Sequence, residues 1–101
     1  MAAPEVIAAD SRHYTVEHED ERVRVPRARY GPGERSVMHA HPARVAVMLT
    51  DGHVRFTLPD GPAQEVRATA GQVLAVPGGD HLPENLGAAP FEAVLIELKG
   101  A

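Results

Sequence analysis

The chain has no cysteine and no tryptophan among its 101 residues. A disulfide framework, a thiolate zinc site, an iron–sulfur cluster and a cysteine nucleophile are therefore excluded. Basic side chains are also in the minority: ten Lys and Arg stand against 14 Asp and Glu, the net charge is −4, and the nine arginines are scattered singly. This distribution argues against a surface that binds a phosphate backbone, so we expect no nucleic-acid partner.

Long hydrophobic runs are absent as well. The longest, from Val45 to Leu49, is far shorter than the roughly 18 residues that a membrane-spanning helix needs, so we expect no membrane partner. The start of the chain has neither a basic region nor a sustained apolar one. We therefore expect no secretion signal and a cytoplasmic protein.

The hydrophobic residues that are present alternate with polar ones, which is the pattern of half-buried strands. Val54, Phe56 and Leu58 show it most clearly, between the turn sequences Asp51-Gly52 and Pro59-Asp60-Gly61. Short segments of this kind recur about every 8 to 12 residues, and no window carries a convincing helical stripe. The sequence predicts an all-β sandwich or barrel.

The length fits a single domain over residues 1–101, with the barrel over about 13–99. Residues 1–10 are rich in alanine without periodicity, so we expect either a loose arm or an edge strand donated to a partner subunit. The second arrangement gives a homodimer, which is the assembly we expect. The alternating segment from Arg22 to Tyr30 contains Pro26, which cannot donate to a ladder, so we expect this strand at a sheet edge or at a bulge.

Two histidines stand out among the six. His39 and His41 are two residues apart, so on a strand both imidazoles point to one face, close enough to chelate one divalent ion. His81 follows a Pro-Gly-Gly-Asp turn and is the candidate third ligand, directed back across the barrel. The pair by itself is a weak motif, because it also arises by chance on a solvated strand.

Glycines frame these histidines at fixed spacings. The first series reads G-x5-H-x-H-x3-V-x6-G and consists of Gly33, His39, His41, Val45 and Gly52. The second series reads G-x5-P-x-G-x-H-x3-N and consists of Gly71, Pro77, Gly79, His81 and Asn85. With the strands around them, the two series cover residues 21–98 and resemble the two motifs of the cupin family. The family's first motif has glutamate at the place of Val45, and its second has one residue more between Gly79 and His81.

The resemblance implies a cupin double-stranded β-helix, a jelly-roll barrel of two antiparallel sheets. It also implies one divalent transition-metal ion held by His39, His41 and His81, with Fe, Mn, Ni, Zn and Cu all compatible. Val45 has no lone pair to offer, so the site keeps open positions, as a catalytic metal needs.

Three functions follow from this resemblance. The first is a metal-binding single-domain cupin that acts on a small molecule, in the manner of a three-histidine non-haem iron dioxygenase. The alternative is a non-catalytic cupin that binds a small molecule or a metal without turnover. A third is a domain that regulates an adjacent enzyme by contact.

A carboxylate near the metal would balance its charge, and five glutamates are candidates. We select none of them as a ligand, because the acidic run 17–21 is typical of a solvated turn and Glu84 has the opposite parity to His81. The candidates are Glu17, Glu19, Glu84, Glu92 and Glu97.

Parity within the strands also predicts the walls of a substrate pocket. We expect Val45, Val47 and Phe56 to line it, which makes the cavity apolar and suited to a compact small molecule. Few polar side chains are available to orient such a ligand, and Asn85 is the first choice because it belongs to the second motif. The others are Arg44, Arg55, Gln64 and Gln72.

Overall fold

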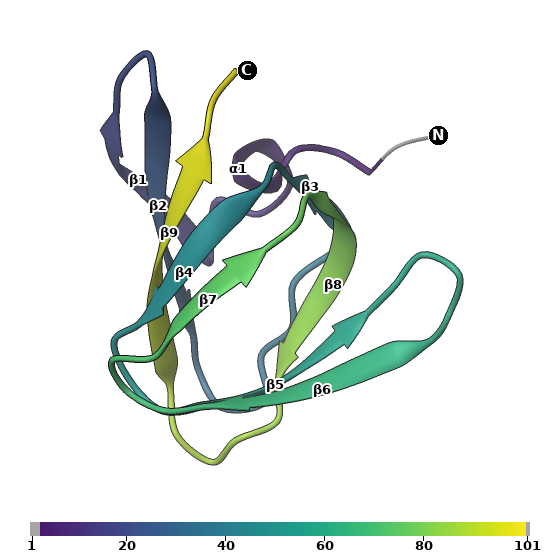
Figure 1. The fold of residues 1–101 in the computed structure, drawn as a ribbon. Helices are drawn as coiled ribbons and strands as arrows, with labels where there is room; N and C mark the ends of the chain where they lie inside the picture. Colours follow the sequence, from purple (N-terminus) through teal and green to yellow (C-terminus); the bar gives the residue numbers. More distant parts are fainter. Residues whose placement is uncertain (1–2, 101) are drawn as a thin grey trace.

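The computed structural model describes residues 3–100, in which nine strands and one short helix are the regular elements. Two antiparallel sheets face each other, as the resemblance implied (Figure 1). One sheet has five strands in the order β1-β2-β9-β4-β7. Their bounds are β1 Tyr14–Glu19, β2 Val23–Tyr30, β4 Arg44–Met48, β7 Val73–Val76 and β9 Phe91–Leu98.

The second sheet has four strands in the order β3-β8-β5-β6. After β3 the chain passes repeatedly from one sheet to the other, so that β4, β7 and β9 lie in the first sheet and the strands between them lie in the second. This alternation is the winding of a double-stranded β-helix. The bounds are β3 His39–His41, β5 Gly52–Thr57, β6 Ala63–Ala68 and β8 Gly79–Asn85.

The core lies between the sheets and is built from alternate residues of each strand. On β9, Phe91, Ala93, Leu95 and Glu97 are buried, while Val94 and Ile96, which alternate with them, are half-buried on the outer face. Tyr30 on β2 stacks on Phe91 with ring centroids 5.0 Å apart. The period-two pattern therefore places one row of each strand inside the barrel, as predicted.

Strand β2 occupies a more central place than its proline suggested. It pairs with β1 on one side and β9 on the other, so it is not an edge strand. Pro26 lies next to an irregularity, because the register of β1 against β2 shifts between Val16 and His18. The bulge alternative was right, since a bulge leaves a ladder position that needs no donor.

Residues 3–10 fold back on their own chain and lie against β3. The amide of Ala40 on β3 donates to the carbonyl of Pro4 at 2.8 Å, and Glu5 forms a parallel bridge with Ala40. A single turn of helix, α1 Val6–Ala9, follows, and the side chain of Glu5 accepts the amide protons of its first turn. Val6 is fully buried, so apolar burial holds the segment against the barrel.

A helix long enough and apolar enough to cross a membrane is absent from residues 3–100.

Candidate metal centre

The three histidines meet on two neighbouring strands. His39 and His41 both point into the barrel from β3, as predicted, and both are buried. Strand β8 pairs with β3, and His81 is the antiparallel partner of His39. The expectation that His81 would reach across the barrel was wrong, because the second sheet places it beside the other two.

A close approach at the turn before β8 permits this pairing. A Cβ atom on Gly78 would lie 3.3 Å from the carbonyl oxygen of His41 and 3.3 Å from the amide nitrogen of Ala43. These neighbours are backbone atoms and have little freedom to move. Glycine at this position therefore lets β8 start directly beside β3.

The imidazole rings surround a common point. Ring centroids are 4.7 to 5.0 Å apart, and each pair of rings is inclined by 79° to 81°. The Nε2 atoms of His39 and His41 are 3.0 Å apart, and one nitrogen from each of the three histidines lies within 4.8 Å of the others. The three rings are therefore nearly perpendicular to one another and each brings one nitrogen to the same small region.

A buried carboxylate stands behind His41. Glu97 on β9 is 1% exposed and places Oε2 3.3 Å from Nδ1 of His41. Its Oε1 accepts a hydrogen bond from Nε of Arg24 at 2.7 Å, and Arg24 also pairs with Glu5. Burial would raise the pKa of Glu97, but hydrogen bonds from His41 and Arg24 outweigh it, so the pKa is lowered and the group is anionic.

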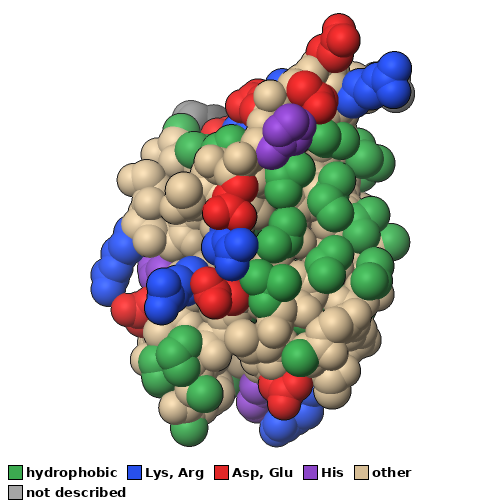
Figure 2. All heavy atoms as spheres, turned by 90° about the vertical axis from the view of Figure 1, so that its left-hand side faces the viewer, with side chains coloured by type: hydrophobic (Ala, Val, Ile, Leu, Met, Phe, Trp, Pro, Cys, Tyr) green, Lys and Arg blue, Asp and Glu red, His purple; other side chains and the backbone are tan. Residues whose placement is uncertain are grey.

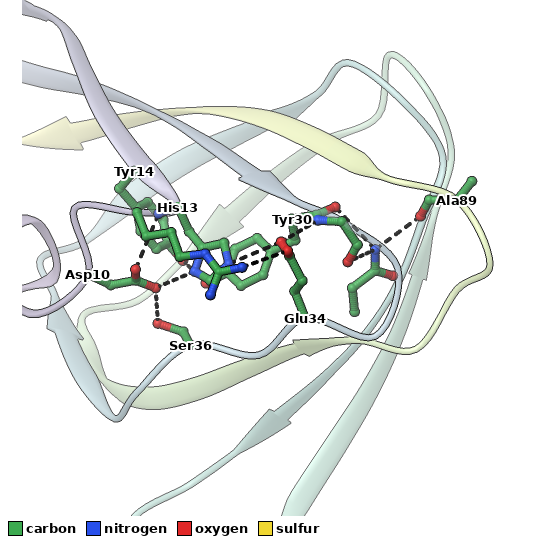
Figure 3. A network of polar contacts seen from close by, with 10 residues as sticks. Asp10, His13, Tyr14, Tyr30, Glu34, Ser36 and Ala89 are labelled. Carbon is green, nitrogen blue, oxygen red and sulfur yellow. Dashed lines mark hydrogen bonds and ion pairs between the residues drawn. The ribbon is translucent and has the colours of Figure 1, made fainter.

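A second buried acid, Asp10, is linked to His39 through the side chain of Ser36. The hydroxyl of Ser36 donates to Asp10 (Figure 3). Its Oγ also lies 3.1 Å from Nδ1 of His39. Because the hydroxyl proton goes to Asp10, Oγ accepts the Nδ1 proton of His39. Burial would raise the pKa of Asp10, but hydrogen bonds from Ser36 and His13 outweigh it and lower the pKa.

His13 extends this network towards the surface. Its Nδ1 is 2.7 Å from Asp10 and its Nε2 is 3.2 Å from Glu34, and its ring stacks on Tyr30 at 4.3 Å (Figure 3). Arg12 completes the network with an exposed ion pair to Glu34. The sequence analysis assigned His13 no role, since its partners lie up to 21 residues away along the chain.

His81 has no comparable support. Its Nε2 is buried without a hydrogen-bond partner among the described residues. Its ring stacks on Phe56, with centroids 4.9 Å apart and planes inclined by 17°. An apolar contact therefore positions His81, whereas polar contacts position the other two ligands.

Burial is the main cause that lowers the pKa of all three histidines. It brings the pKa of His39 to about 4 and that of His81 to about 2, with His41 as the next cause in both cases. The hydrogen bond with Glu97 opposes burial at His41, whose pKa is nevertheless lowered. The three imidazoles are neutral near pH 7 and can offer lone pairs to a metal.

These features fit a metal ion. The Nδ1 atoms of His39 and His41 are held by Ser36 and Glu97, which leaves a lone pair on each Nε2 atom. Two such lone pairs 3.0 Å apart repel each other unless a cation lies between them. Two nitrogens about 2.1 Å from one ion and at right angles are themselves about 3.0 Å apart, in agreement with the observed separation.

A cavity of about 410 Å³ adjoins the histidines and is bordered by His41 and His81. Its walls come from both sheets and are mostly apolar, and its volume is within the range of small-molecule sites. Phe56 borders the cavity, as predicted. Tyr14 and Tyr30 also border it, and their hydroxyls are 2.7 Å apart in a mutual hydrogen bond.

Arg44 and Gln64, two of the predicted polar residues, also border the cavity, whereas the predictions for Val45 and Val47 were wrong. Val45 and Val47 lie on the outer face of β4, whereas Arg44, Ala46 and Met48 face inward and border the cavity. Parity was counted from the histidines through the turn that follows β3, and a turn between two sheets does not preserve the alternation of one strand.

Asn85 is fully engaged in a turn and does not border the cavity. Its Nδ2 donates to the carbonyls of Tyr30, Gly31 and Ala89, and its Oδ1 accepts the amide proton of Gly87. It is 1% exposed. Its role is therefore to hold the turn after β8 against the end of β2.

Sequence reasoning also passed over two residues of the site. Glu97 was named and not selected, although its place in the inward row of β9, with Phe91, Ala93 and Leu95, was a usable signal of burial. Ser36 carries no signal in the sequence, because its role depends on Asp10 being folded against it.

Comparison with known proteins agrees with this architecture. The sequence profile of the cupin domain matches residues 26–97. A crystal structure of a cupin domain from Bordetella pertussis Tohama I is 30% identical, with a TM-score of 0.80 and 99% of each chain covered. Among curated proteins, none matches.

Two more distant crystal structures share the fold. One is an uncharacterized conserved protein with a double-stranded β-helix domain from Klebsiella pneumoniae (24% identity, TM-score 0.68), and the other is a cupin superfamily protein from Desulfitobacterium hafniense DCB-2 (19% identity, TM-score 0.62). In both cases 86% of this chain and 76% of the other are covered. With the profile match over most of its length and a related cupin over nearly all of it, the chain belongs to the cupin family.

Proposed function

We propose that this cupin binds one divalent transition-metal ion through His39, His41 and His81 and receives a small molecule in the adjoining cavity. The observation that carries the proposal is the convergence of three neutral imidazoles, with the Nε2 atoms of His39 and His41 3.0 Å apart and that of His81 without a partner. Imidazole is a common ligand of Fe, Ni, Cu and Zn.

We further propose that the protein is an enzyme of the three-histidine non-haem iron dioxygenase type. Iron(II) would supply open coordination positions for substrate and dioxygen. The chain supports this by offering no carboxylate from the inward face of β4, where Arg44, Ala46 and Met48 stand. Glu97 and Ser36 orient their histidines, and the mostly apolar cavity walls offer water few hydrogen bonds beside them.

One observation favours the alternative, a binding cupin without turnover. Tyr14 and Tyr30 are the hydroxyl-bearing side chains on the cavity wall, and they hydrogen-bond to each other. Burial raises the pKa of both, so neither releases a proton near neutral pH. A cavity whose hydroxyl groups bond to each other and stay protonated has fewer groups for acid–base catalysis.

Metal analysis followed by an oxygen-uptake assay tests these proposals. We expect about one ion per chain, and its loss in His39→Ala. Iron-loaded protein is then offered small enols, diketones and thiols in an oxygen electrode. Uptake supports the enzyme, bound iron without uptake favours the binding cupin, and protein that retains no ion contradicts the metal site.

We also propose a homodimer, formed through the outer face of the five-stranded sheet. Val45 and Val47 on β4 and Val94 and Ile96 on β9 present apolar side chains there, and Val73 is 61% exposed. Figure 2 shows hydrophobic side chains gathered over this side of the molecule. Apolar patches of this kind mark contacts between proteins.

Sedimentation velocity distinguishes this interface from exchange of the N-terminal segment. We expect Ile96→Glu to lower the dimer fraction. If removal of residues 1–10 lowers it and Ile96→Glu does not, the N-terminal segment forms the interface instead. The cytoplasmic location stays a prediction, to be checked by cell fractionation.

A further inference from the structure

Arg44 is a buried cation without an acidic partner. It begins β4, is 6% exposed and borders the cavity. Its Nη1 donates two long hydrogen bonds of 3.4 Å, to the carbonyls of Pro42 and Pro77. Within residues 3–100, no carboxylate lies within ion-pair distance of its guanidinium. This isolation is unusual, because buried arginines are normally paired.

The acids near Arg44 have other partners. Glu97 is its neighbour across the β4–β9 ladder, but the oxygens of Glu97 face Arg24 and His41. Asp80 also borders the cavity, and its Oδ2 accepts the amide proton of Ala3 at 3.2 Å. Neither acid forms an ion pair with Arg44.

A guanidinium is always charged and carries five N–H donors in a rigid fork that matches a carboxylate. The two bonds from Nη1 leave most of these donors unused, and the side chain borders the cavity. An anion that enters the cavity therefore finds a cation that is already desolvated and held in place. The geometry favours a ligand with one acidic group.

The other residues of the cavity wall indicate the polarity of the rest of that ligand, and the cavity volume indicates its size. Met48, Phe56, Phe91 and Leu95 border it, so the body of the ligand is apolar. The volume of about 410 Å³ fits a compact molecule better than a nucleotide sugar.

Arg44 and the histidines face the same space. Arg44, His41 and His81 all border the cavity. A carboxylate on Arg44 therefore leaves the body of the ligand beside the imidazoles.

We infer that Arg44 binds the carboxylate of a small organic acid with an apolar body, placed in the cavity beside the three histidines. The inference deepens the proposed function by naming a substrate class, and it rests on that function for the use of the cavity. The charge–charge contact itself does not require a metal.

Binding of phenylacetate and of its neutral isostere phenylacetamide, measured by calorimetry, tests the inference. The titrations use wild-type protein stripped with a chelator and protein loaded with one metal ion. We expect the acid to bind about tenfold to a hundredfold more tightly than the amide in both forms, as for other charge-assisted hydrogen bonds.

Substitutions then assign the preference to one residue. In Arg44→Gln the two affinities should become equal, and Arg44→Lys should keep part of the preference. Arg55→Gln is the matched control, because Arg55 on β5 lies outside the cavity and pairs with Glu65 and Glu84 on the surface. It should keep the full preference.

Several results would overturn the inference: no preference for the acid in wild-type protein, a preference that survives Arg44→Gln, or no binding of either probe. A preference present only in metal-loaded protein would also overturn it, because the carboxylate would then bind the ion. If Arg44→Gln does not fold, Arg44→Lys and the wild-type pair still decide. Metal stoichiometry is measured separately, so failure of the metal site is distinguishable from failure of Arg44.

Discussion

His39 and His41 differ from His81 in what stands behind them. His41 rests against Glu97 and His39 against Ser36 and Asp10, whereas the Nε2 atom of His81 has no partner. The supported pair has its ring tautomers assigned by these contacts. His81 is oriented by stacking on Phe56. The difference teaches that one cluster of candidate ligands can combine two rings fixed by polar contacts within the chain and one ring fixed by an apolar contact.

The two sheets contribute different parts of the candidate site. All three candidate ligands belong to the four-stranded sheet, whereas Glu97 and Arg24 belong to the five-stranded one. The barrel must therefore be closed before the ligand pair is supported. We expect metal affinity to depend on residues of both sheets.

Replacing one histidine that has a polar partner and the one that has none tests this difference most directly. His81→Ala and His39→Ala should both lose stoichiometric metal binding, measured by elemental analysis. Without metal, the free energy of unfolding of His81→Ala should lie within about 1 kcal/mol of the wild-type value. The reason is that the change removes a buried nitrogen that had no hydrogen-bond partner.

His39→Ala should lower the free energy of unfolding by about 2 kcal/mol or more, since it removes a fully buried ring and the hydrogen bond from its Nδ1 to Ser36, which keeps only its bond to Asp10. Urea unfolding of the chelator-treated proteins measures both. If His81→Ala unfolds the protein, His81 is a structural residue and the comparison fails.

Glu97→Gln should weaken metal binding about tenfold to a hundredfold, the usual effect of losing a carboxylate behind a histidine ligand. It also removes the ion pair with Arg24. Glu92→Gln is the matched control, because Glu92 lies on the outer face of the same strand and makes only loose ion pairs with Arg27 and Arg29. Competition with a chromogenic chelator gives both affinities, and equal losses would show that Glu97 has no special role.

Acidification should destabilise the metal-free protein. The pKa of His39 is about 4 in the folded state against an ordinary value of 6.5, so the unfolded chain takes up a proton that the folded chain does not. Stability is therefore lost as the pH falls below 6.5, by roughly 2 kcal/mol between pH 7 and pH 5 from His39 alone. Urea unfolding at the two pH values should show a smaller loss in His39→Gln, and an equal loss would refute the assignment.

Ser36→Ala should have the smallest effect, a few-fold loss of metal affinity and about 1 kcal/mol of stability. The change removes a neutral acceptor, and Asp10 keeps its contact with His13. Asp10→Asn should cost more, because Asp10 also accepts from Ser36 and from the amide of His13. If Ser36→Ala equals Glu97→Gln in metal affinity, the two supported histidines depend on their partners to the same extent.

The candidate ligands could be predicted from the sequence, whereas the residues around them could be predicted only in part. The pair His39 and His41 could be predicted because alternation along one strand is local geometry. Val45 and Val47 were misplaced because β3 ends at His41 and the chain changes sheets before Arg44. Phe56 was placed correctly because its own strand shows a clear alternation.

The sequence alone determined the all-β class, the spacing of the three histidines and the absence of any thiolate ligand, since each depends on residue type or on neighbours a few positions apart. The tertiary structure alone decided that Glu97 supports His41 from 56 residues away and that Arg44 is left without an acid. Such contacts depend on which strands pair and in what register, and that is settled by packing over the whole barrel.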